Sequence, residues 1–388
     1  MAQVITITTV VVVAAMATLT SSLNVKLSGI NYNPRKGADW EPLKLKCKSA
    51  SEVATDMKIL ATVTSNIRLY SMVDCNQMEL VVPAAKAAGL TVWAGIWVDK
   101  NAATYAAERD AFAALIKKGV IDATVIGLHV GSEAIYRKEV TADEAIKNFK
   151  EVKALVTAAG LKFPVTIADI GDVYVANPQL FAAVDIVSAN AFPFWEAKPI
   201  EGCIEYFYSR MEPLIKLATD NGKKIMIGET GWATQGKADG ASVASPENAV
   251  TWFNDFHVLA TDLKWSYYYY TSFDTTWRHN PAVNTSDPEV ENYFGIFDVK
   301  GVLKPAFAAL KVAKRVNIDV SPTTTTPAAS EKNGKPVATT ASPSAIISTG
   351  GATSKPNTNT ATATSAAPLV TTAIMSAVVM VLTIAASM

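Results

Sequence analysis

Two glutamates follow apolar segments that read as buried strands, and their placement could bring two carboxylates to one reaction centre. Glu133 stands in GSEAIYR, after an apolar run at 124–130, and Glu229 stands in GETGW, after another at 224–228. Two carboxyl groups flanking a sugar–sugar bond are what glycoside hydrolysis needs, because one donates a proton and the other acts as nucleophile or base. A single glutamate at a strand end is more often an ion-paired surface residue, so the weight of this interpretation rests on the pair.

The elements that must hold these glutamates alternate between strand and helix over residues 26–318. Apolar runs predict strands at 27–32, 67–70, 91–97, 124–130, 164–168, 185–191, 224–228 and 265–271. Apolar spacing near 3.6 residues predicts helices at 50–64, 76–88, 102–118, 142–159, 203–220 and 246–262, with a final one near 305–315.

This alternation predicts an α/β fold, a single (β/α)8 TIM barrel, in which chemistry takes place at the C-terminal ends of the strands. The fourth and seventh strands lie on opposite sides of a closed ring, so Glu133 and Glu229 can face each other across its mouth. A doubly wound sheet is the alternative, but no glycine-rich phosphate loop follows the first strand.

Aromatic, amide and charged side chains stand at the other strand ends. Sugar rings have apolar C–H faces that stack on aromatic rings, and hydroxyl groups that hydrogen-bond to amides, carboxylates and guanidinium groups. Core packing is the alternative for any single aromatic residue. The FPFW stretch at 192–195 reads instead as a loop, where exposed rings are costly unless they bind something. The candidate substrate-binding residues are Tyr32, Tyr70, Trp97, Asn190, Phe192, Phe194, Trp232, Phe273, Asp274 and Arg278.

Several segments together resemble glycoside hydrolase family 17, the 1,3-β-glucanase family, in its wall-associated fungal and oomycete form. They are, in chain order, LSGINYNP, IRLYSMVDC, VWAGIWVD, GLHVGSEAIYR, SANAFPFW, IGETGWAT and FDTTWR, and the resemblance runs from about residue 28 to about 310. The resemblance implies a retaining mechanism with Glu133 as general acid/base and Glu229 as nucleophile. It also matches Glu291, in ENYFGIFD, to a further acidic site residue, and Arg278 to a basic residue near the eighth strand.

The chain departs from plant members of that family at two positions. Ser132 stands before the acid/base where plant members often carry Asn, and it is a candidate site residue that reaches less far toward a sugar hydroxyl. Asn190 could compensate for it. Thr275 stands where plant members carry an acid, which leaves Glu291 as the better supporting carboxylate. These departures weaken any transfer of a plant-type substrate preference.

Composition limits the partners and cofactors. Lys+Arg and Asp+Glu both number 35, so the basic excess that nucleic acid binding needs is absent from the sequence. Neither the cysteines nor the three histidines show a metal-ligand spacing, and we expect no metal and no cofactor. His129 could point into the barrel, where a hydrogen-bonded core role is favoured over a catalytic one. Cys47 and Cys75 flank the first strand–helix unit and could pair, leaving Cys203.

The ends of the chain predict export and anchoring. Residues 1–22 hold an uncharged apolar run followed by small residues, as in a signal peptide, although a buried N-terminal strand is the alternative. Residues 319–365 are rich in Ser, Thr and Pro, which predicts a disordered stalk. Residues 366–388 are apolar to the last residue, which favours a GPI-anchor signal over a membrane-spanning helix. We therefore expect a monomer at the cell surface or in the cell wall, bound to the membrane through a lipid anchor.

Three functions are consistent with these patterns. The first is a retaining endo-1,3-β-glucanase, a hydrolase of β-1,3-glucan. The second is a β-1,3-glucanosyltransferase that uses the same two glutamates, with a sugar hydroxyl in place of water. The third is a glucan-binding surface protein without catalysis, against which the presence of both glutamates argues.

Overall fold

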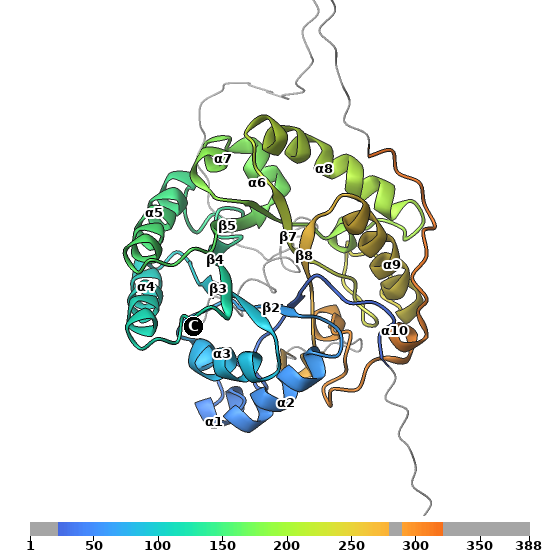
Figure 1. The fold of residues 1–388 in the computed structure, drawn as a ribbon. Helices are drawn as coiled ribbons and strands as arrows, with labels where there is room; N and C mark the ends of the chain where they lie inside the picture. The colour runs from blue at the N-terminus through green and yellow to red at the C-terminus, as the bar shows by residue number, and fades with distance from the viewer. Residues whose placement is uncertain (1–21, 279–288, 321–388) are drawn as a thin grey trace, which may run out of the picture.

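The computed structural model describes residues 22–278 and 289–320, and its parallel strands close into a barrel (Figure 1). The ring closes where β1 pairs with β8, at Ile30 and Tyr269. The predicted (β/α)8 barrel is therefore confirmed. The strands are β1 (Ile30–Asn31), β2 (Asn66–Arg68), β3 (Thr91–Ile96), β4 (Val125–Ser132), β5 (Val165–Ile170), β6 (Val187–Asn190), β7 (Ile225–Thr230) and β8 (Ser266–Tyr269).

Helices surround the barrel on its outside (Figure 1). Two of the long ones begin at capping boxes, Ser49 with Glu52 before α2 and Thr141 with Glu144 before α5, in which side chain and backbone satisfy each other's hydrogen bonds. The helices are α1 (Leu43–Lys46), α2 (Ala50–Leu60), α3 (Gln77–Ala87), α4 (Ala102–Lys117), α5 (Ala142–Ala158), α6 (Gly171–Ala176), α7 (Gln179–Ala183), α8 (Cys203–Asp220), α9 (Pro246–Asp262) and α10 (Pro305–Ala309).

The structure differs from the sequence prediction in two places. Between β5 and β6 the chain forms the short helices α6 and α7, which were not predicted. The predicted helix at 305–315 is wrong beyond Ala309, because residues 310–320 are extended and run beside α9 (Figure 1). Apolar side chains in this segment recur mostly at every second position, which suits an extended chain packed on one face. The half-buried ones are Leu310, Val312, Val316, Ile318 and Val320.

Side chains fill the interior of the barrel below the mouth. Trp93, Met226 and Tyr268 pack together there, and the rings of Trp93 and Tyr268 meet edge to face at 6.0 Å. Gly127 makes room for this cluster, because a Cβ atom at that position would lie 2.4 Å from the Trp93 ring. The barrel is thus a packed core that supports the strand ends, as expected of this fold.

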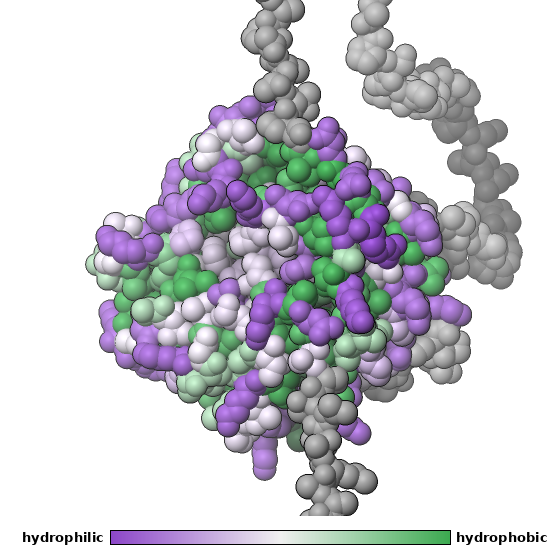
Figure 2. All heavy atoms as spheres, turned by 45° about the vertical axis from the view of Figure 1, so that its right-hand side comes forward, coloured by the Kyte–Doolittle hydropathy of each residue, from purple (hydrophilic) through white to green (hydrophobic). Residues whose placement is uncertain are grey.

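The signal at residues 1–22, the stalk at 319–365 and the anchor signal at 366–388 lie almost wholly outside the described residues, and they stay predictions. In the part of the chain that is described, no helix has both the length and the apolar character to cross a membrane. On the side of the barrel turned forward in Figure 2, apolar areas lie between hydrophilic ones.

Candidate active site

Both predicted glutamates lie at the C-terminal end of the barrel, on opposite strands. Glu133 directly follows β4 with a left-handed backbone (φ 58°), and its N–H donates to the carbonyl of Ala168 on β5 at 2.8 Å. Such a backbone is unusual for a residue with a side chain and is found preferentially at functional sites. Glu229 lies within β7 and is 8% exposed. Each glutamate is therefore held by strand backbone rather than by a free loop.

A buried arginine neutralises Glu229. Arg68, at the end of β2, is fully buried, and its Nη1 donates to Glu229 Oε1 at 2.5 Å. The same guanidinium group donates to Asn31 Oδ1 at 3.0 Å and to Ser132 Oγ at 3.1 Å. Burial, the largest single effect, lowers the pKa of Arg68, but the charge and hydrogen bond of Glu229 together with the charges of Tyr70 and Glu133 outweigh it, and the pKa is raised. Glu229 therefore lies against a buried cation that is held in place by its other hydrogen bonds.

Beneath Arg68, a neutral histidine fixes the direction of the guanidinium group. His129 Nδ1 accepts from Arg68 Nε at 3.0 Å, so the ring proton stands on Nε2 and is shared with Ser188 Oγ at 2.9 Å. Burial, and then the charge of Arg68, lower the pKa of His129 well below its usual value. His129 is therefore a hydrogen-bonded residue of the barrel interior, the role favoured from the sequence.

Glu133 has the opposite electrostatic environment. Asn190 Nδ2 donates to its Oε1 at 2.9 Å, and no basic group is hydrogen-bonded to it among the described residues. Burial, and then the charge of Glu229, raise the pKa of Glu133. Ser132 Oγ lies 3.3 Å from Glu229 Oε1 and 3.4 Å from Asn190 Nδ2, so a continuous polar network joins the two carboxylates. One carboxylate is thus hydrogen-bonded to a buried cation, whereas the other is hydrogen-bonded to a neutral amide.

Two hollows open on either side of the pair, and Glu133, Glu229 and Tyr270 line both of them. The Trp97 hollow measures ≈ 370 Å³ and is walled by the segments that follow β1, β2, β3 and β8. The Phe192 hollow measures ≈ 360 Å³ and is walled mainly by the segments that follow β4, β5 and β6. A cleft of this form can hold a chain of sugars on both sides of the bond between the carboxylates.

Most of the candidate binding residues line one hollow or the other. In the Trp97 hollow, the guanidinium group of Arg137 lies 4.8 Å from the centre of the Trp97 ring and braces it. In the Phe192 hollow, the rings of Phe192 and Tyr270 meet edge to face at 5.7 Å. Predicted residues in the Trp97 hollow are Tyr70, Trp97, Ser132, Phe273 and Asp274. Those in the Phe192 hollow are Asn190, Phe192 and Glu291.

Three predicted aromatic residues pack in the core and do not line either hollow. The hydroxyl of Tyr32 donates to Asp56 on α2 at 2.7 Å, and its side chain is fully buried. Phe194 and Trp232 meet edge to face at 5.3 Å, and the Trp232 indole N–H donates to the carbonyl of Val243. Their role is to support the loops from below. Arg278 ends the short helix η3 (Thr276–Arg278), and its side chain lies outside the described part of the structure.

Sequence reasoning missed two buried carboxylates that hold the walls. Glu108, on α4, accepts from the backbone N–H groups of Met72 at 2.6 Å and Trp97 at 3.3 Å, and also from the Ser71 hydroxyl. It therefore ties the segment after β2 to the end of β3. Burial raises the pKa of Glu108 to about 7.

Asp169, at the end of β5, holds the turn that follows Glu133. Its carboxylate accepts from the backbone N–H groups of Ile135 at 3.1 Å and Tyr136 at 3.4 Å. Burial, and then the charge of Glu133, raise the pKa of Asp169 to about 7. Within the described residues, no group of three His, Cys, Asp or Glu side chains is placed to hold a metal ion.

A sequence family matches the barrel. The BtgE/BtgC glycoside hydrolase domain matches residues 29–295. The glucan 1,3-beta-glucosidase of Saccharomyces cerevisiae is 31% identical over 271 residues, which cover 66% of this chain and 85% of the yeast protein. The probable glucan endo-1,3-beta-glucosidase btgC of Aspergillus fumigatus is 29% identical over 304 residues, 73% of this chain but only 43% of that protein.

Solved structures share the fold. A β-1,3-glucanosyltransferase of Rhizomucor miehei, an active-site mutant in complex with laminaritriose, superposes with a TM-score of 0.63 at 26% identity, covering 74% of this chain and 98% of the other. The same enzyme's structure is described as glycoside hydrolase family 17. An endo-laminarinase of Formosa has the same fold, with a TM-score of 0.59 at 20% identity over 76% of this chain and 92% of the other.

Proposed function

Because the chain belongs to the BtgE/BtgC glycoside hydrolase family, within the 1,3-β-glucanases of family 17, we propose that it cleaves β-1,3-glucan with Glu229 as nucleophile and Glu133 as acid/base. The observation that carries these roles is the asymmetry of the pair. Glu229 is bonded to the buried Arg68, whereas burial and the charge of Glu229 raise the pKa of Glu133. A nucleophile must be ionised and an acid must hold its proton, so these two environments support the proposed roles.

The reaction then runs in two displacements. Glu133 protonates the oxygen of the sugar–sugar bond while a carboxylate oxygen of Glu229 attacks the anomeric carbon, which breaks that bond and forms a covalent glycosyl ester. Glu133, now ionised, takes a proton from a water molecule, whose oxygen attacks the anomeric carbon and releases Glu229. Two inversions give net retention. Throughout, the Arg68 guanidinium group stabilises the negative charge that returns to Glu229.

The partners of each glutamate assign the two hollows. Glu229 is held by Arg68 and Ser132, and Ser132 lines the Trp97 hollow. The ring under attack therefore lies on that side. Glu133 is held by Asn190, which lines the Phe192 hollow, so the leaving sugar lies there. The Phe192 hollow measures ≈ 360 Å³, which is room for a second sugar that could act as acceptor. This favours the glucanosyltransferase as the other candidate function.

Product analysis separates these functions. We would incubate the protein with laminari-oligosaccharides at millimolar concentration and follow the products by chromatography. Shorter products alone support a hydrolase, and products longer than the substrate support a glucanosyltransferase. Cellulose and mannan serve as control polymers. Binding of laminarin with no product of either kind would contradict the proposal and support a glucan-binding protein.

A further inference from the structure

The large apolar side chains that remain exposed among the described residues all lie in segments that follow strands. They are Trp40, Leu43, Leu45, Val73, Tyr136, Val243, Val299 and Val302. In a (β/α)8 barrel these segments form the face that carries the active site. The apolar surface is therefore gathered on the face that meets the substrate.

The largest group of these side chains belongs to one lobe, residues 33–48, between β1 and α2, which we call the Trp40 lobe. Trp40 is 64% exposed, Leu43 71% and Leu45 56%. Val73, 48% exposed, stands beside the lobe, because the disulfide between Cys47 and Cys75 joins the base of the lobe to the segment after β2.

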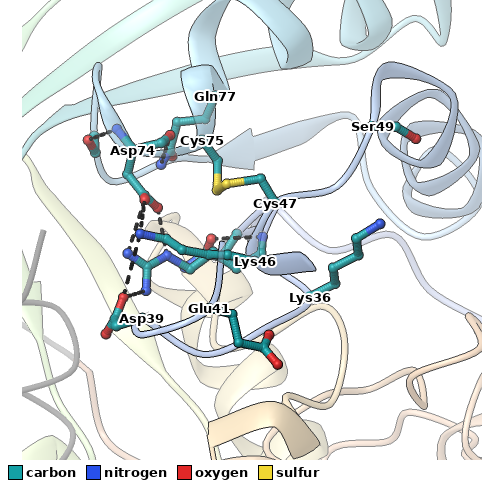
Figure 3. Close-up of a disulfide and its surroundings, with 12 residues drawn as sticks. Lys36, Asp39, Glu41, Lys46, Cys47, Ser49, Asp74, Cys75 and Gln77 are labelled. Atoms are coloured by element: carbon teal, nitrogen blue, oxygen red, sulfur yellow. Dashed lines mark hydrogen bonds and ion pairs between the residues drawn. A yellow bond between two sulfur atoms is a disulfide. The ribbon is translucent and has the colours of Figure 1, made fainter. Parts of the chain in front are cut away.

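Two cations of this lobe are buried, whereas Lys44 is exposed. Arg35 is 3% exposed and Lys46 9%, and both form ion pairs with Asp74, at 2.7 Å and 3.3 Å. Figure 3 shows the end of the Lys46 side chain between Asp74 and Asp39, near the disulfide. A lobe that exposes one Trp and two Leu side chains together is unusual for a protein surface. Exposed apolar groups of this kind mark a binding surface.

The position of the Trp40 lobe beside the cleft and the pairing of its charges indicate what kind of molecule would bind it. Arg35, Lys36 and Lys48 of the lobe also line the Trp97 hollow, so the lobe continues the wall of the cleft. Lys36 and Lys48 pair with Glu52 and Asp56 on α2, at 2.8 Å and 2.5 Å. Four of the lobe's five cations are thus paired with carboxylates, and Lys44 stands exposed between Leu43 and Leu45. A neutral polymer whose sugar rings have flat C–H faces suits such a surface.

Resting on the proposed function, we propose that the Trp40 lobe is a second glucan-binding surface, outside the two hollows, which docks the enzyme on insoluble β-1,3-glucan. Sugar rings of a neighbouring chain would stack on Trp40 and contact Leu43 and Leu45. The disulfide and the buried ion pairs hold these side chains in place before binding, which lowers the entropy lost on contact. The lobe then matters for particulate glucan and not for short soluble chains.

The test compares the full chain with a triple variant, Trp40→Ser, Leu43→Ser and Leu45→Ser. All three positions are exposed, so the barrel should keep its thermal midpoint. We expect kcat/KM on laminaripentaose within about twofold of wild type, and binding to particulate β-1,3-glucan in a sedimentation assay weaker by roughly tenfold or more. The single variant Trp40→Phe, which keeps a flat ring at this position, should retain most of the binding to particulate glucan. Val243→Ser with Val302→Ser is the matched control, with exposed valines from other segments.

Four outcomes overturn the proposal. The first is that the triple variant sediments with particulate glucan as wild type does, and the second is that it loses activity on soluble glucan as much as binding to particulate glucan. The third is that the valine control loses the same binding. The fourth is that the triple variant loses only binding to vesicles of anionic phospholipid, or only self-association in light scattering. The proposed function is tested separately, and it is wrong if the wild-type protein releases no product from laminaripentaose. In that case the sedimentation assay still measures binding of particulate glucan by the Trp40 lobe.

Discussion

The two hollows share their catalytic carboxylates but are built in different ways. The wall of the Trp97 hollow is cross-linked, by the Cys47–Cys75 disulfide and by Glu108, which joins two strand ends. The wall of the Phe192 hollow is a cluster of rings, in which Phe192 meets Tyr270 at 5.7 Å and Phe294 at 6.1 Å. A ring under attack must be held in one geometry, whereas a leaving sugar must be exchanged at each turnover. In the proposed assignment, the cross-linked wall holds the ring under attack and the wall of packed rings holds the leaving sugar.

The largest effect should come from the glutamates that both hollows share. Glu229→Ala should abolish turnover of every substrate, and added azide should restore it with inverted product. Glu133→Ala should lower turnover of natural glucan by about 10²–10⁴-fold, because proton donation to the leaving group is lost. Aryl glycosides with good leaving groups should be affected least, and azide should here give the retained product. Rates and product configuration by NMR check both variants.

The same assignment fixes a distance. Retaining enzymes keep the two carboxyl groups about 5–5.5 Å apart, so that the nucleophile reaches the anomeric carbon directly. We predict this spacing for Glu133 and Glu229 in a crystal structure. A separation near 9 Å, or substantial laminarin cleavage by both alanine variants, would show that the roles are wrongly assigned.

Opening the disulfide should lower the stability of the protein and, of the two hollows, affect the Trp97 hollow. The loop that Cys47 and Cys75 close spans 28 residues, so Cys47→Ser with Cys75→Ser should lower the free energy of unfolding by about 3–4 kcal/mol. KM for laminari-oligosaccharides should rise more than kcat falls, because the wall loses order while Glu133 and Glu229 stay on their strands. Calorimetry and initial rates measure this. Cys203→Ala, at the buried free cysteine, is the control, and an unchanged KM in the double variant would contradict a rigid wall.

The wall should also respond to pH through Glu108. Its pKa of about 7, against an ordinary value of 4.5, means that the folded state keeps a proton that the unfolded chain has lost between those values. Stability from this group is therefore present at low pH and is lost as pH rises through that window. The advantage of wild type over Glu108→Gln should shrink by on the order of 3 kcal/mol between about pH 4.5 and 8. Denaturant unfolding across pH checks this. Glu79→Gln at the exposed end of α3 is the control, and a pH-independent difference would refute it.

The smallest effect should come from the ring cluster. Phe192→Ala with Trp195→Ala removes aromatic surface from the leaving side only. We expect the ratio of transfer to hydrolysis to fall several-fold, in line with about 0.5–1.5 kcal/mol for an aromatic contact, while hydrolysis changes little. Chromatography of products at millimolar oligosaccharide gives the ratio. An equal loss of both reactions would mean that these rings support the pair itself.

The sequence was sufficient to predict the barrel and the glutamate pair, because buried parallel strands are apolar and each glutamate directly follows such a run. It was not sufficient to single out Arg68. This residue lies in a three-residue strand, and its partner Glu229 is 161 residues away. The available signal was an arginine between apolar residues in NIRLY, since an unpaired buried charge is too costly to occur.

Glu108 and the aromatic residues show the same limit. Glu108 stands in the sequence AAERDAF, which reads as an exposed helix face, and only the packing of α4 turns it toward the strand ends. Tyr32, Phe194 and Trp232 stand at or after strand ends, where a side chain can point into the cleft or under the loop. The sequence pattern does not distinguish those two directions, and in all three cases the side chain is buried.

The disulfide also has a consequence for when the enzyme becomes competent. A newly made chain in a reducing compartment keeps Cys47 and Cys75 as thiols, so the lobe after β1 is not yet joined to the segment after β2. The strands can close and the glutamates can meet before that bond forms, but the wall that holds the sugar still is incomplete. Under the proposed function, firm binding of the sugar would then require formation of the disulfide after folding. In a reducing cytosol the protein would stay in the form that binds sugar more weakly.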